Sequence, residues 1–76
     1  MYRFLVIIEQ GETNYSAYSP DLPGCIATGR TLEEVEQNMR EAIAMHLEGM
    51  IEDGEPIPVH TSQAEHMDVA APTSAA

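Results

Sequence analysis

Apolar residues recur at spacings of three and four between residues 32 and 50, which predicts one amphipathic helix. Thr31 and Glu34 have the spacing of a capping box, in which the hydroxyl accepts from the Glu34 amide and the carboxylate reaches back. Gly54 suits a left-handed cap after the last turn, and Pro56 forbids continuation. The apolar positions of this helix are Leu32, Val35, Met39, Ala42, Ile43, His46, Leu47 and Met50.

Stretches rich in β-branched and aromatic residues precede the helix and predict three strands. Gln10 to Thr13 form the first turn between them. Ser19 to Gly24 form a stiff loop, because two prolines fix φ and the glycine permits a turn. The predicted strands cover residues 2–8, 14–19 and 25–28.

This order of elements predicts an α+β fold of two layers, an antiparallel meander with one covering helix. Ile57 to His60 predict a brief fourth strand beside the first, restricted to an edge by its prolines. The full order is then β-β-β-α-β, within one domain of residues 1–60. Residues 61–76, mostly Ala, Ser, Thr and Pro, predict a disordered tail.

The charge balance narrows the classes of partner. Thirteen acidic residues stand against three basic ones, which gives a net charge of −10. Phosphates are held mainly by clustered Lys and Arg, so direct binding of nucleic acid or of an anionic membrane surface is not expected. The apolar run near the N-terminus is too short to span a membrane. The composition suits a protein with basic partners.

Few residues are candidates for catalysis or for metal binding. Cys25, the one cysteine, excludes an intramolecular disulfide, fits a reducing cytosol and is expected in the core rather than as a nucleophile. The three histidines match no structural zinc pattern, and His46 falls on the apolar helix face as a packing residue. Glu33 and Glu36 resemble half of a di-iron motif but lack its Glu-x-x-His, so a solvated face is expected. We therefore predict no catalytic residue, metal site or cofactor.

Two features go beyond an ordinary small domain. The first strand is apolar on both faces, whereas one helix covers only one of them. Self-association, most simply as a two-fold dimer with Leu5 and Ile7 in the contact, would cover the second face. The alternative is that the tail folds back over it.

The second feature is an acidic helix end. Carboxylates there oppose the helix dipole, so they lower stability and are candidates for contact with a basic partner. Asp21, held in the rigid loop between Pro20 and Pro23, could join them. The alternative is a solvated acidic end with no partner. The predicted partner-binding residues are Asp21, Glu48, Glu52, Asp53 and Glu55.

An ordered set of short motifs over about residues 2 to 60 resembles the HicB-like antitoxins. These are YSAYSPDLPGC at 15–25, GRTLEE at 29–34, EAI at 41–43, HLEG at 46–49 and EDGEPIP at 52–58. The resemblance implies a truncated, catalytically degenerate ribonuclease-H-like fold. It also implies binding and neutralisation of HicA, a small basic toxin that cleaves mRNA.

Many members of that family carry a C-terminal DNA-binding domain, whereas this sequence has no helical pattern and no basic residue beyond Val59. A stand-alone, cytoplasmic antitoxin domain is therefore the leading hypothesis. A second hypothesis is an orphan oligomeric domain that binds another partner. A ribonuclease-H-type enzyme is disfavoured, because only Glu9 and Asp21 lie on or beside the predicted strands to hold Mg²⁺.

Overall fold

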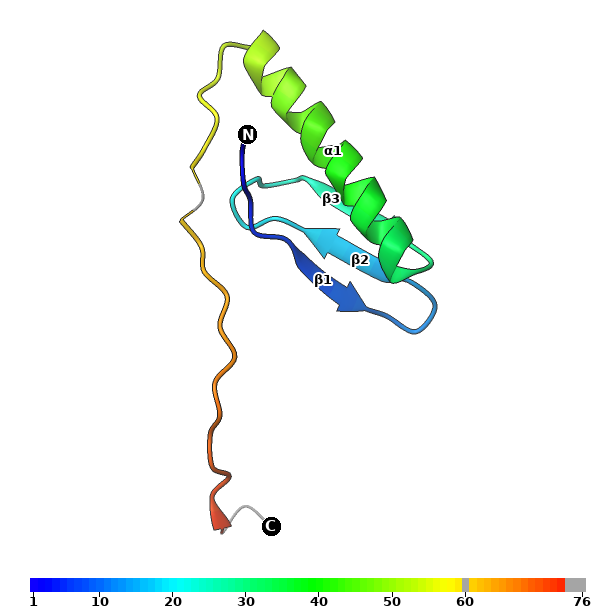
Figure 1. Ribbon diagram of the computed structural model, residues 1–76, viewed down its shortest axis with the longest axis vertical. Coiled ribbons are helices and arrows are strands. Elements are labelled where there is room, and N and C mark those ends of the chain that lie inside the picture. Colours follow the sequence, from blue (N-terminus) through cyan, green and yellow to red (C-terminus); the bar gives the residue numbers. More distant parts are fainter. Residues whose placement is uncertain (60, 74–76) are drawn as a thin grey trace.

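Three short strands form an antiparallel sheet in the order β1-β2-β3 (Figure 1). The computed structural model describes residues 1–59 and 61–73. In the sheet, Ile8 lies opposite Ala17, and Ala17 lies opposite Ala27. The predicted α+β class and the meander are confirmed. The strands are β1 (Ile7–Gln10), β2 (Tyr15–Tyr18) and β3 (Ile26–Gly29).

The first strand begins at Ile7, five residues later than the predicted Tyr2. Its neighbour β2 ends at Tyr18, opposite Ile7, and Ser19 then accepts from the Leu22 amide in a turn that leads away. Residues 2–6 therefore have no neighbouring strand among the described residues with which to form backbone hydrogen bonds, although their side chains favour strands. A strand requires a partner as well as a propensity.

The predicted fourth strand is also absent from residues 57–59, while His60 lies outside the described residues. Pro56 and Pro58 lack backbone N–H groups, so this segment offers few donors to a neighbouring strand. Residues 61–72 form neither helix nor strand; the first of them lie beside the domain, and the later ones extend away from it (Figure 1). The disorder of residues 61–76 stays a prediction, and residues 74–76 are outside the described range.

The helix α1 (Leu32–Glu52) begins and ends where its local signals predict. The Glu34 amide donates to Thr31 Oγ1 at 3.1 Å, and Glu34 Oε1 accepts from the Arg30 amide at 3.0 Å, one residue further back than in a standard capping box. Gly54 adopts φ 72°. The Glu55 and Gly54 amides donate to the carbonyls of Met50 and Ile51, which completes a Schellman cap.

The core lies between α1 and the two strands β2 and β3. Gly29 lets the helix approach closely, since a Cβ there would lie 2.5 Å from the Val35 nitrogen. Cys25 is buried, as predicted, and Leu22 from the proline loop is only 1% exposed. The buried apolar residues are Ala17, Leu22, Cys25, Val35 and Met39.

The helix is much longer than the sheet that it covers. Its 21 residues span about 31 Å, whereas each four-residue strand spans about 13 Å. The C-terminal half of α1 therefore projects past the strands, next to the N-terminal segment (Figure 1). Phe4, Ile43 and Leu47 are half-buried around this overhang.

Candidate partner-binding surface

Four of the five predicted partner-binding carboxylates lie together at the C-terminal end of α1. Glu48 and Glu52 are four residues apart on one face, Asp53 is the C-cap, and Glu55 follows the Schellman turn. All four side chains are exposed. The last turn contains no basic residue, so nothing on the helix neutralises this end. The result is a solvent-facing acidic tip on a helix end that already carries partial negative charge.

Asp21 belongs to a different environment. It lies in the loop between β2 and β3 and is half-buried. Its Oδ1 accepts from the Thr61 amide at 3.2 Å, and its Oδ2 is buried without a hydrogen-bond partner among the described residues. The carboxylate therefore holds the start of the tail against the loop. A contact between any of the five carboxylates and a partner stays a prediction.

The helix-free face of the sheet carries an apolar row across all three strands. The register aligns Ile7 with Tyr18 and Tyr18 with Ile26. Tyr18 is 42% exposed and Ile26 is 68% exposed. Of the six strand residues on this face, Glu9 alone is charged. Sequence reasoning missed Ile26 as part of this row, because only the register shows which alternating residues of different strands meet.

The N-terminal segment divides between the two faces as its alternation predicts. Phe4, Val6 and Ile8 pack against the core cluster. Leu5 and Ile7, which alternate with them, are half-buried and are not part of that cluster. Their participation in an oligomer contact stays a prediction.

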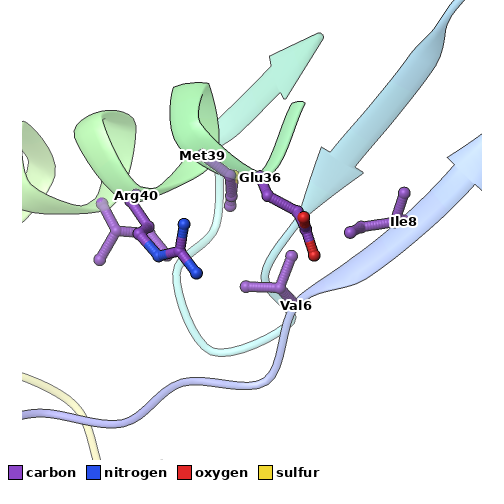
Figure 2. A pocket seen from close by; sticks show the side chains of 6 residues that line it. Val6, Ile8, Glu36, Met39 and Arg40 are labelled. Atoms are coloured by element: carbon purple, nitrogen blue, oxygen red, sulfur yellow. The ribbon is translucent and has the colours of Figure 1, made fainter. Parts of the chain in front are cut away.

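An open groove of about 290 Å³ separates the N-terminal part of the sheet from α1 (Figure 2). It exists because the helix packs over β3 and β2 rather than over β1. Its walls are mainly apolar, while the Glu36 carboxylate and the Arg40 guanidinium face it from the helix (Figure 2). The lining residues are Val6, Ile8, Glu36, Met39, Arg40 and Ile43.

The described residues form no cluster of potential metal-binding side chains. Over residues 1–59 and 61–73, no three His, Cys, Asp or Glu side chains are grouped as a metal site would require. Burial raises the pKa of the Cys25 thiol, so the thiol stays protonated at neutral pH. His46 is half-buried and shares a shallow depression with Cys25 and Met45. No helix in the described part of the chain combines the length and the hydropathy of a membrane span.

The chain is similar to proteins of one bacterial family. The family described as "HicB_like antitoxin of bacterial toxin-antitoxin system" matches residues 4–73. An uncharacterised 14.9 kDa protein of Haemophilus phage HP1 is 41% identical over 69 residues, covering 83% of this chain and 52% of the phage protein. The chain thus spans about half the length of that relative. A UPF0150 protein of Archaeoglobus fulgidus is 35% identical over 66 residues, covering 83% of this chain and 96% of the archaeal protein.

The fold also resembles a solved structure. A chain of the HicA3 and HicB3 toxin–antitoxin complex superposes with a TM-score of 0.60 at 26% sequence identity. The match covers 80% of this chain and 72% of the other. The likeness therefore extends over most of the domain described above.

Proposed function

The chain belongs to the HicB-like antitoxin family of bacterial toxin–antitoxin systems, and we propose from this membership that it binds and neutralises a small basic HicA-like toxin. The observation that carries the proposal is the family match over residues 4–73. The likeness to a chain from the HicA3–HicB3 complex supports it, because that structure holds a toxin and an antitoxin together.

The acidic tip formed by Glu48, Glu52, Asp53 and Glu55 is the proposed docking surface. A toxin that binds RNA must carry a basic surface, because the phosphate backbone is recognised chiefly by Lys and Arg. Exposed carboxylates at the tip would attract that surface and orient it during the encounter. The antitoxin would then cover the basic surface, so the toxin could not reach its RNA.

Neutralisation by occlusion requires no bond to be made or broken. The antitoxin would act stoichiometrically in the cytoplasm, without a cofactor and without binding nucleic acid itself. The charge supports the last point, since thirteen acidic residues against three basic ones would repel a phosphate backbone.

Co-expression with a short reading frame for a basic protein, where one adjoins the gene, tests the proposal. We expect the two chains to co-purify, and we expect titration of the antitoxin to abolish RNA cleavage at a fixed molar ratio. A catalytic amount of antitoxin that suppressed cleavage would contradict occlusion. Failure to bind any neighbouring basic protein would favour the orphan oligomeric domain.

A further inference from the structure

The N-terminal segment combines the features that favour aggregation through β-strands. Residues 2–8 are Tyr, Arg, Phe, Leu, Val, Ile and Ile, with one charge and neither proline nor glycine. Segments of about six or seven residues with high β-propensity, low charge and no proline stack readily with copies of themselves. Only Ile7 and Ile8 of this segment belong to β1, so residues 2–6 have no strand partner among the described residues. Native proteins usually protect such an edge with charges, prolines or a covering segment.

The chain that follows the helix lies along this segment. Pro58 and Val59 line a depression of about 290 Å³ together with residues 1–4 (Figure 1). Further along, residues 62–64 line a depression of about 310 Å³ together with residues 3–6. We call residues 57–59 and 61–64 the strap. These residues form no strand, and a proline has no N–H to donate, so the strap covers the edge without extending the sheet.

Within the described part of the chain, one hydrogen bond joins the strap to the domain. The Thr61 amide donates to Asp21 Oδ1 at 3.2 Å, between residues 40 positions apart in the sequence. The side chain of Gln63 donates to Glu65, which is part of the tail itself. Packing adds little, because most strap side chains are exposed and depressions lie between the strap and the N-terminal segment. Asp21 is half-buried in a loop stiffened by two prolines, so its acceptor oxygen is held in place.

We propose that the strap, latched by Asp21, shields residues 2–6 from strand addition and so keeps the chain from aggregating through this segment. The closed strap occupies the space beside residues 3–6 that an added strand would need. Breaking the hydrogen bond between Asp21 and Thr61 frees the strap and uncovers the edge. Arg3 and Glu9, which flank the uncharged residues between them, are a second barrier, since charges at the ends of an apolar run oppose stacking. This role does not depend on toxin binding.

Two substitutions of Asp21 in the full-length chain isolate the latch. Asp21→Ala and Asp21→Asn remove the same charge, but the asparagine side chain keeps an oxygen that accepts from the Thr61 amide. Loss of one hydrogen bond shifts an equilibrium by about three- to tenfold. Hydrogen exchange of the Thr61 amide, followed by NMR, should therefore be faster by that factor in Asp21→Ala and close to the parent rate in Asp21→Asn. Thioflavin T fluorescence of agitated samples below the melting temperature should rise faster in the same order. Equal aggregation of the two variants overturns the proposal.

A second pair of variants tests the latch from its donor side and leaves the proline loop unchanged. Thr61→Pro removes the N–H group that donates to Asp21, whereas Thr61→Ala keeps it. We expect Thr61→Pro to aggregate about three- to tenfold faster than Thr61→Ala. Equal rates for this pair overturn the proposal, whatever Asp21→Ala does to the loop.

Added charges identify the segment through which the opened chain aggregates. In the Thr61→Pro chain, Leu5→Lys should suppress the thioflavin T signal, because it interrupts the apolar run at a residue outside the core cluster. Ile26→Lys is the matched control, since it adds the same charge at a side chain that is 68% exposed on another strand. It should leave the faster aggregation in place. Equal suppression by both lysines overturns the proposal, because net charge rather than the uncovered edge would then control aggregation.

Discussion

Replacing Gly29 by alanine would test the closest contact between the helix and the sheet. The added Cβ would lie 2.5 Å from the nitrogen and 2.8 Å from the Cα of Val35, whereas carbon atoms prefer contacts of about 3.5–4.0 Å. The obstacle is backbone, so no side chain can rotate away. The start of α1 would have to retreat by about 1 Å. Val35, which is fully buried, would move with it and loosen the core.

Overpacking of this kind lowers the free energy of unfolding by about 1–3 kcal/mol, and a backbone obstacle favours the upper part of that range. In so small a domain the melting temperature should fall by roughly 10–20 °C. Gly49→Ala is the matched control, because no atom lies within 4 Å of its Cβ position inside the helix. That change should raise stability by about 0.8–1 kcal/mol. Urea unfolding measures the free energy of unfolding of both variants. A Gly29→Ala variant as stable as the parent would refute the close approach.

Three further changes probe the acidic tip, the tail and the cysteine. Changing Glu48 and Glu52 to Gln should slow association with the toxin in stopped-flow at low salt, and should raise stability by about 0.3–1 kcal/mol each, because the carboxylates oppose the helix dipole. The same change at Glu12 and Glu65 is the control. If the variant changed at Glu48 and Glu52 associates as fast as the parent chain, then the acidic tip is only a solvated surface. Deleting residues 62–76 should leave the melting temperature nearly unchanged in calorimetry, and a fall of more than about 5 °C would contradict this. Burial raises the pKa of Cys25, so iodoacetamide should react slowly until the chain unfolds, and stability should fall as pH rises above the ordinary thiol range.

Signals close together in the sequence were sufficient to predict α1. Thr31, Glu34 and Gly54 act within one turn of the helix ends, and each is found where its chemistry requires it. The strands were harder to delimit, because a strand boundary depends on its neighbour. The length of β1 is set by where β2 turns away, and the sequence of β1 itself does not indicate where that turn begins.

Long-range contacts account for most of what was missed. Leu22 precedes a proline in a loop, yet two successive turns, with carbonyls from Ser19 and Leu22 as acceptors, bury it beneath the helix. Asp21 accepts a hydrogen bond from Thr61, 40 residues away, so a residue predicted at a partner surface also holds the start of the tail. No local pattern encodes either contact. The four carboxylates at the helix end were predictable because helical spacing places Glu48 beside Glu52, and the other two follow directly in the sequence.

The uneven charge of the chain implies opposite salt dependences for the proposed binding of the toxin and for the self-association predicted from the sequence. A toxin attracted to the acidic tip loses that attraction as salt rises, since the Debye length falls from about 10 Å at 0.1 M to about 3 Å at 1 M. Two copies of a chain with net charge −10 repel each other, so screening should strengthen a self-association that the apolar residues Leu5 and Ile7 hold together. Between about 50 and 500 mM salt, the toxin should therefore bind more slowly while the homodimer becomes tighter. Stopped-flow and sedimentation on the same preparation measure the two trends. If both associations weaken together, then the self-contact depends on charge pairs, and the apolar residues Leu5 and Ile7 do not hold the copies together.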